Sequence, residues 1–187
     1  MSKCDKLCDH FHISMQSGST DTLKRMNRKY DKNLLIDVAK NLRKYFPDCY
    51  IAADCIVGFP DETDSEFAET KQTIEEMNLS DIHVFKYSKR AYTRAAKMDG
   101  QIDGVLKKKR SEELINIASI NKRKFLTKHI GNTEKVLFES YEDNYLQGYT
   151  SNYIKVSVRG EGKLCGTIQD VVLTSLEGET IQGNLAQ

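Results

Sequence analysis

The sequence predicts an α/β fold followed by a small all-β fold: a partial (half) TIM-like barrel with parallel strands, then an oligonucleotide-binding-type barrel. Two observations predict this order. In the first half of the chain, short apolar runs alternate with amphipathic stretches of helical length, as in parallel strands joined by crossover helices. After Gly131 the hydrophobic period changes to two, and Gly, Asn and Asp separate the short runs.

The first half contains three predicted strands and two predicted helices. The strands are HFHISMQ (10–16), YIAADCIVGF (50–59) and DIHVFKYS (81–88). The helices are NLLIDVAKNLRKYF (33–46) and DSEFAETKQTIEEMN (64–78). Thr63 and Asp64 offer caps to the second helix, and Pro47 and Asp48 end the first.

A long helix and a set of short strands make up the rest of the chain. Residues 104–130 place apolar side chains on one helical face: Leu114, Ile117, Ala118 and Phe125. Gly131 is a natural helix stop. The predicted antiparallel strands are VLFES, YLQGYTS, YIKVSVRG, GTIQDVVLT and TIQGNLA. We therefore expect two domains, residues 1–131 and 132–187.

Composition indicates an ordinary globular protein. Charged residues make up 29% of the 187 residues and the hydrophobic set 39%. We find neither a secretory signal nor an apolar run long enough to cross a membrane. The five cysteines therefore read as reduced thiols, and we expect a cytoplasmic protein without a membrane partner.

The net charge of +1 hides a strongly basic middle segment. Residues 86–131 hold 13 basic and four acidic residues, whereas the segments before and after them are each net −4. A localised contact with a polyanion explains this asymmetry, and a solvated helix face is the alternative.

The segment CDKLCDHFHISMQ raises the question of a metal site. Cys4, Cys8, His10 and His12 supply enough donors for zinc, but the chain has no C-x2-C pair. An iron–sulfur motif of the form C-x3-C-x2-C needs a cysteine at position 11, which is Phe11. We expect no bound metal, with thiols and histidines packed or exposed; a zinc-binding protein is the less favoured alternative.

Polar residues on two predicted strands point to a ligand pocket. Side chains alternate along a strand, so Phe11, Ile13 and Met15 share one face, and the other face holds a polar stripe of His10, His12, Ser14 and Gln16. Asp54 interrupts the apolar run of the second strand. Ligands of open α/β sheets and barrels bind at the carboxyl ends of strands. Those ends are Gln16-Ser17-Gly18, Gly58-Phe59-Pro60 and Tyr87-Ser88.

Three motifs resemble one enzyme family in order and spacing. They are HFHISMQSGSTDTLKRMNRKY, DCIVGFPDETDSEFAET and YSKRAYTRAAKM. The family is that of the radical S-adenosylmethionine methylthiotransferases that modify tRNA, and HFHIS with YSKR resembles the branch acting on N6-threonylcarbamoyladenosine 37. The C-terminal strands resemble the family's RNA-binding TRAM domain. Asp61, Tyr92 and Arg94 stand where the family usually has Gly or Pro.

The resemblance implies a set of cofactor-binding residues. Ser14 and Gln16 would face the ribose and methionine parts of S-adenosylmethionine, and Arg28 would bind its carboxylate. Ile56 and Gly58 would flank the adenine, Phe85 and Tyr87 would offer backbone and stacking contacts, and Asp54 belongs to the same predicted pocket. Full-length members of the family carry two 4Fe-4S clusters. This chain holds no triad for either, so we expect no bound cofactor and no catalytic residue of its own.

The resemblance also implies tRNA, through its anticodon stem-loop, as the partner. The predicted contacts are Lys89, Arg90, Arg94, Lys97, Tyr149, Tyr153 and Lys155, with tRNA lying across the junction of the two domains. We expect an inactive C-terminal fragment of a methylthiotransferase that lacks the N-terminal domains of its polypeptide. Its exposed sheet edge could associate with another chain. A stand-alone RNA-binding protein with a vestigial barrel remains the alternative.

Overall fold

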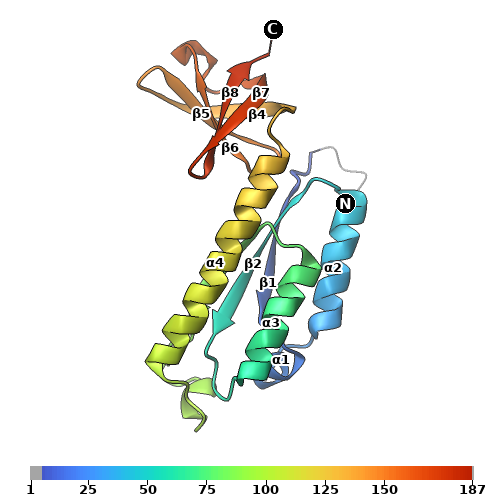
Figure 1. Ribbon diagram of the computed structural model, residues 1–187, viewed down its shortest axis with the longest axis vertical. Coiled ribbons are helices and arrows are strands. Elements are labelled where there is room, and N and C mark those ends of the chain that lie inside the picture. Colours follow the sequence, from blue (N-terminus) through green and yellow to red (C-terminus); the bar gives the residue numbers. More distant parts are fainter. Residues whose placement is uncertain (1–5, 187) are drawn as a thin grey trace. The chain divides into compact units, whose positions relative to one another are not determined.

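The computed structural model describes residues 6–186, and the chain forms two compact units (Figure 1). The sheet unit consists of residues 11–47 and 51–121. The barrel unit consists of residues 122–186 together with the described residues up to His10 and residues 48–50. Within residues 6–186, none of the helices combines the length and the hydrophobicity that crossing a bilayer requires.

The sheet unit contains the predicted strands and helices. Its elements in chain order are β1 (His10–Gln16), α1 (Thr20–Arg25), α2 (Lys32–Tyr45), β2 (Tyr50–Val57), α3 (Asp64–Met77), β3 (Asp81–Lys86), the 3₁₀ helix η1 (Ala95–Lys97) and the start of α4 (Gly104–Lys128). The sheet order is β1-β2-β3. β2 and β3 pair in parallel, as predicted, from Ala52 opposite Asp81 to Val57 opposite Lys86. α1 and η1 were not predicted, because elements of one or two turns show no hydrophobic period.

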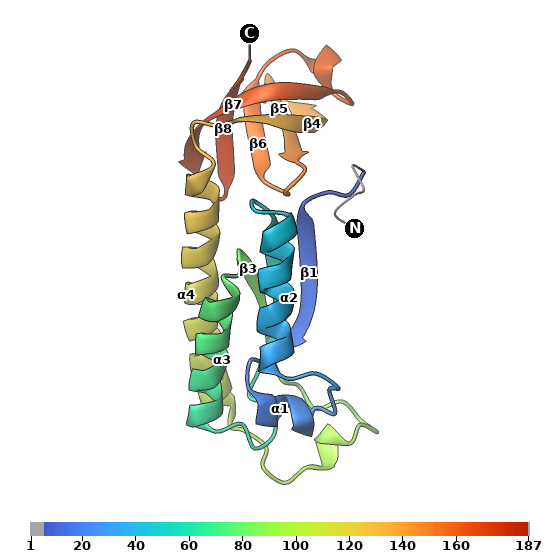
Figure 2. The same ribbon diagram turned by 90° about the vertical axis from the view of Figure 1, so that its right-hand side faces the viewer.

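The two faces of β2 differ in burial only toward its carboxyl end. Its odd-numbered residues Ile51, Ala53, Cys55 and Val57 are at most 1% exposed. Figures 1 and 2 show α2 and α3 packed along one side of the strands. Burial raises the pKa of the Cys55 thiol, with smaller effects of Glu62 and Asp54, so it remains a neutral packing group. Asp54 and Ile56 point to the other, half-open face.

The start of α3 is fixed by its caps. Thr63 and Glu66 form a capping box, in which the Thr63 hydroxyl accepts from the Glu66 amide and the Glu66 carboxylate accepts from the Thr63 amide. Arg25 adds a two-pronged ion pair to the same carboxylate, at 2.6 and 2.9 Å. The helix therefore begins after Thr63, as the sequence predicted.

The barrel unit contains a closed five-stranded barrel. Its elements are β4 (Thr133–Glu142), β5 (Tyr145–Thr150), β6 (Lys155–Arg159), the 3₁₀ helix η2 (Gly162–Leu164), β7 (Ile168–Glu177) and β8 (Thr180–Leu185). The order around the barrel is β4-β5-β6-β8-β7. The expectation that all pairs are antiparallel is wrong for one pair, because β6 and β8 run parallel. A closed ring with an odd number of strands requires at least one parallel neighbour.

The barrel core consists of inward-facing aliphatic and aromatic side chains. The members at most 1% exposed are Val136, Phe138, Leu146, Ile154, Val156, Val158, Val171, Leu173 and Ile181. Gly148 of β5 lies opposite a bulge between Phe138 and Ser140. A Cβ at Gly148 would stand 2.0 Å from the Leu137 carbonyl oxygen, so only glycine allows this approach.

Candidate ligand pocket and nucleic-acid contacts

The open face of the β1–β3 sheet carries a pocket of about 450 Å³ at the carboxyl ends of the strands. Its lining residues are Gln16, Met26, Arg28, Asp54, Ile56, Phe59, Phe85, Lys86, Tyr87, Ser88, Arg90, Thr93 and Ala95. Six of the eight residues predicted to bind S-adenosylmethionine are among them: Gln16, Arg28, Asp54, Ile56, Phe85 and Tyr87. Strand-end geometry therefore brings these residues together from segments far apart in the sequence.

The strand ends position the pocket residues. Gln16 ends β1 with φ +65°, a left-handed conformation that breaks the strand. Arg28 follows α1, where its amide donates to the Leu23 carbonyl at 2.9 Å and its side chain stays exposed. Phe85 is 52% exposed at the end of β3 and offers the pocket an apolar surface.

Tyr87 is held firmly beside the pocket. Its amide donates to the Val57 carbonyl at 2.9 Å, and its ring packs edge-on against Phe59 with centroids 5.2 Å apart. The Lys107 ammonium lies 5.3 Å from the ring centroid. The Tyr87 hydroxyl is buried and has no hydrogen-bond partner within residues 6–186. A buried phenol without a partner is a group that a ligand can satisfy.

Ser14 and Gly58, the other two predicted residues, do not line the pocket. Ser14 is exposed, and its carbonyl accepts from the Tyr30 hydroxyl at 2.7 Å. Burial raises the pKa of Tyr30, against a smaller opposing effect of Arg28, so the phenol keeps its proton. Gly58 has φ +70°, and a Cβ there would lie 2.3 Å from Lys107 Cγ. The backbone and Lys107 thus account for this glycine without a ligand.

The pocket has a cationic lining. Arg28, Lys86 and Arg90 face a single acidic residue, Asp54. Guanidinium and ammonium groups of this kind favour a carboxylate or phosphate group in the pocket.

Two departures from the family pattern fall at unusual backbone positions. Asp61 has φ +61° and Tyr92 has φ +66°, in the left-handed region that favours glycine. The Asp61 amide donates to the Gly100 carbonyl at 2.7 Å, which fixes this turn. Both residues therefore adopt the conformation for which the family's usual glycine is suited.

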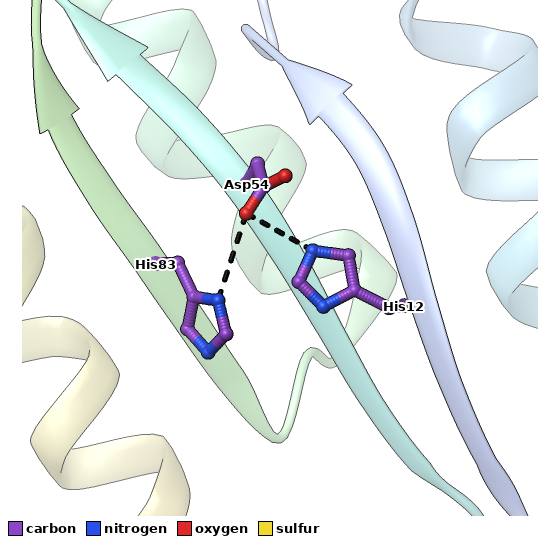
Figure 3. Close-up of side chains that lie close together, drawn as sticks. All are labelled: His12, Asp54 and His83. Carbon is purple, nitrogen blue, oxygen red and sulfur yellow. Dashed lines mark ion pairs between the residues drawn. The ribbon is translucent and has the colours of Figure 1, made fainter.

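Three side chains on the open sheet face lie close together, and the sequence analysis did not single out one of them, His83. Asp54 Oδ1 lies 3.0 Å from His12 Nε2 and 3.6 Å from His83 Nδ1 (Figure 3). Asp54 and His83 are register partners on β2 and β3. We call these three residues the His–Asp–His cluster. The alternation in DIHVFK puts His83 on the same face as Phe85, which was the available signal for it.

The described residues do not fit a three-cysteine iron–sulfur ligand set at the start of the chain. Cys4 lies outside the described residues, and Cys8 is exposed. Phe11, at the position of the third ligand, packs its ring against Phe46 with centroids 5.1 Å apart. The ring of His10 lies 5.3 Å from that of Tyr50 and 4.6 Å from that of Tyr153, within the barrel unit.

The residues predicted to bind RNA form two groups, one in each unit. Lys89, Arg90, Arg94 and Lys97 are all exposed in the segment that follows β3. In the barrel unit, the rings of Tyr149 and Tyr153 stack with centroids 4.8 Å apart and planes 19° apart. Lys155 is the register partner of Tyr149 and is exposed. The first group is a cationic surface and the second an aromatic platform, both suited to single-stranded nucleic acid.

Comparisons with known proteins agree with these features. The family model described as the Radical SAM superfamily matches residues 1–74. A threonylcarbamoyladenosine tRNA methylthiotransferase of Bacillus subtilis (strain 168) is 38% identical, covering 91% of this chain and 39% of its own length. A tRNA-2-methylthio-N(6)-dimethylallyladenosine synthase of Thermoanaerobacter sp. (strain X514) is 35% identical, covering 100% of this chain and 40% of its own length.

A solved structure supports the fold. Coproporphyrinogen III oxidase from Escherichia coli, described as a radical SAM enzyme, matches with a TM-score of 0.51 and 20% identity over 60% of this chain and 27% of that one. The chain spans about two fifths of the length of the curated relatives that it matches. Two such relatives share at least 35% identity with the chain over at least 91% of its length, and together with the family model they support its relationship to the radical S-adenosylmethionine tRNA methylthiotransferases.

Proposed function

We propose that this chain is the part of a tRNA methylthiotransferase that contacts both S-adenosylmethionine and tRNA. The substrate base of the complete enzyme is N6-threonylcarbamoyladenosine 37, in the anticodon stem-loop. The observation that carries the proposal is the pocket at the strand ends, which gathers six residues that the family resemblance implies. Relatives that act on tRNA adenosines support it.

The pocket residues suit the parts of S-adenosylmethionine. The Arg28 guanidinium pairs with the ligand carboxylate through two hydrogen bonds, and the Gln16 amide serves its polar methionine or ribose groups. Ile56 and Phe85 provide apolar surface for the adenine, and the Tyr87 hydroxyl gains a partner. When bound, S-adenosylmethionine supplies the adenosyl and methyl groups for the reaction; these residues hold and orient it.

We expect the chain alone not to perform the reaction, because Phe11 stands where a C-x3-C-x2-C motif needs its third cysteine. After anaerobic incubation with iron, sulfide, reductant, S-adenosylmethionine and tRNA, we expect no 2-methylthio nucleoside by mass spectrometry of digested tRNA. A methylthiolated product from the isolated chain would contradict this assignment.

Calorimetry tests the pocket directly. We expect weak or absent binding of S-adenosylmethionine to this chain, because a pocket open on one side leaves much of the ligand in water and offsets little of its lost translational freedom. Micromolar affinity would show that the pocket is more complete than proposed.

The role of Arg28 is tested in the complete enzyme. Arg28→Ala is expected to weaken S-adenosylmethionine binding by about ten- to hundredfold, the equivalent of ~1.5–3 kcal/mol for charged hydrogen bonds. Arg28→Lys retains the charge but loses the two-pronged geometry, so it recovers only part of the affinity. Lys29→Ala, an exposed neighbour, is the matched control. If Arg28→Ala and Lys29→Ala change the affinity for S-adenosylmethionine equally, Arg28 does not bind the ligand.

The stand-alone RNA-binding alternative is favoured by one observation, the stacked Tyr149–Tyr153 pair in a closed barrel. This alternative predicts that the chain binds tRNA. It also predicts that Arg28→Ala has no effect in a complete polypeptide that contains this chain. The Arg28 experiment therefore separates the two functions.

A further inference from the structure

We propose that the His–Asp–His cluster, made of His12, Asp54 and His83, binds a divalent cation of the zinc class. One atom from each residue, two imidazole nitrogens and one carboxylate oxygen, lies within 4.8 Å of the other two. This inference goes beyond the proposed function and does not depend on it, because neither tRNA nor S-adenosylmethionine enters the argument.

The separations of the donor atoms suit a metal ion. Bonds of ~2.0–2.2 Å in tetrahedral geometry place neighbouring ligand atoms about 3.4 Å apart. The two separations from Asp54 Oδ1, 3.0 Å to His12 and 3.6 Å to His83, lie on either side of this value. The histidine side chains are 36% and 50% exposed, so both can rotate by the small amount that closes the remaining gap.

A hydrogen-bonded cluster alone does not explain both histidines. His12 lies at hydrogen-bond distance from Asp54, but 3.6 Å is too long for a hydrogen bond from His83. The imidazole rings nevertheless converge, with centroids 5.0 Å apart. A shared cation would account for the convergence of all three groups on one point.

The scaffold under the cluster is rigid. Each ligand comes from a different strand, and Asp54 and His83 are opposite each other in the parallel ladder (Figure 3). The residues flanking Asp54, Ala53 and Cys55, are fully buried on the opposite face, which fixes the direction of the Asp54 side chain. Ligands on strands hold their spacing better than ligands on loops.

The ligand set indicates both the metal and its accessibility. Two imidazoles and one carboxylate suit zinc and other first-row divalent ions rather than magnesium or calcium. Three protein ligands leave a coordination position open, as in zinc sites that exchange a ligand. Asp54 also lines the 450 Å³ pocket, so that position is available to a molecule in the pocket.

This site differs from the zinc site considered at the start of the chain. That alternative used Cys4, Cys8, His10 and His12, whose spacing is poor. The His–Asp–His cluster shares only His12 with it and uses no cysteine. The expectation that the chain binds no metal was drawn from the N-terminal spacing alone, and our proposal departs from it.

Titration of the tag-free, metal-stripped chain with Zn²⁺ tests the site, with calorimetry as the readout. We expect one ion per chain. His12→Ala, Asp54→Asn and His83→Ala should each weaken binding by about 100-fold or more, beyond the ~10–100-fold that loss of a supporting partner costs. His10→Ala, on the same strand and face, and the double variant Cys4→Ser/Cys8→Ser are matched controls that keep wild-type affinity.

Cobalt supplies a second, spectroscopic measurement. The Co²⁺-loaded chain should show visible d–d bands without thiolate-to-metal charge transfer, and the bands should vanish in Asp54→Asn. Circular dichroism confirms that each variant is folded, which is expected because the three side chains are partly exposed. The proposal is overturned if Zn²⁺ fails to bind, if the cluster variants bind normally, or if binding disappears in Cys4→Ser/Cys8→Ser.

Discussion

At the scale of single residues, Arg110 of the sheet unit is a charged side chain that is almost fully buried. Its side chain is 3% exposed and donates to the Glu62 carbonyl, to Glu62 Oε1 at 2.7 Å and to Asp64 Oδ1 at 2.7 Å. Glu62 is itself 5% exposed at the side chain and accepts from the Gly58 amide at 3.1 Å. One buried cation thus fastens α4 to the loop between β2 and α3.

Arg110→Met should destabilise the protein by about 3–5 kcal/mol, because it leaves the Glu62 carboxylate buried without its cation. Urea unfolding measures this loss. Burial raises the pKa of Glu62, and Arg110 opposes that effect. A carboxyl group with a raised pKa stabilises the fold fully at low pH and loses that contribution as pH rises. The loss in the free energy of unfolding caused by Arg110→Met should therefore grow from acid to neutral pH.

The control for Arg110 is Lys108→Met on the same helix. Lys108 is 72% exposed and lies 3.8 Å from Glu112, so its loss should change stability by less than about 1 kcal/mol. The double variant Arg110→Met/Glu62→Gln should recover part of the stability, since it removes both charges. A deficit for Arg110→Met no larger than that of Lys108→Met would contradict the buried-pair account.

At the scale of elements, the start of α3 depends on the Glu66 carboxylate. Burial by itself raises the pKa of Glu66, but the ion pair with Arg25 and the hydrogen bonds from Thr63 outweigh it and hold this pKa below its ordinary value. A carboxylate with a lowered pKa contributes stability above its unfolded pKa and loses it as pH falls through the folded value.

Glu66→Gln should cost about 1.5–3 kcal/mol at neutral pH, the range for hydrogen bonds to charged groups. The difference from wild type should shrink below about pH 4, where the wild-type carboxylate begins to protonate. Ser65→Ala, an exposed change in the same turn, is the control and should be neutral at every pH. A Glu66→Gln deficit that is constant from pH 7 to strongly acid solution would refute this explanation.

The barrel strands provide a second prediction at the element scale. Gly148→Ala should strongly destabilise the barrel, because the new Cβ would overlap the Leu137 carbonyl oxygen and backbone atoms cannot move aside without breaking the β4–β5 ladder. Gly104→Ala is the matched control, because its Cβ meets nothing within 4 Å at the start of α4. That change should be neutral or stabilising by up to about 1 kcal/mol. Thermal unfolding of both variants measures the two changes in stability.

At the scale of the whole molecule, the proposed function assigns two surfaces to tRNA binding, one in each unit. The segment after β3 offers exposed cations, and the barrel unit offers the stacked tyrosines. The cations supply affinity that depends on salt, whereas stacking of bases on aromatic rings does not require charge. The two contributions can therefore be measured independently.

Neutralising Lys89, Arg90 and Arg94 together should weaken tRNA binding and reduce the magnitude of the salt slope by about 2–3, or roughly one per phosphate contact. Binding is measured by fluorescence anisotropy over a range of salt concentrations. A triple alanine variant at Lys40, Lys44 and Lys108, all exposed, controls for net charge. If the salt slope is unchanged while Tyr153→Ala and Lys155→Ala abolish binding, the barrel acts alone.

Local patterns in the sequence were sufficient to predict the main elements. The alternation of apolar residues placed β1, β2 and β3, and the Thr63 cap placed the start of α3. Period-two runs predicted the five barrel strands. Of the strand-end residues named from the sequence, Gln16, Phe59, Tyr87 and Ser88 line the pocket. These features depend on near neighbours in the chain, so a single sequence contains their signal.

The sequence by itself thus determined the element order, the family resemblance and the type of residue at the strand ends. Only the tertiary structure decided which distant residues meet. The parallel register sets His83 opposite Asp54, closure of an odd-numbered barrel makes β6 and β8 parallel, and packing of α4 turns Arg110 from an apparent surface charge into a buried partner of Glu62. Register and helix packing are set by the sum of many long-range contacts, so no local stretch of sequence encodes them.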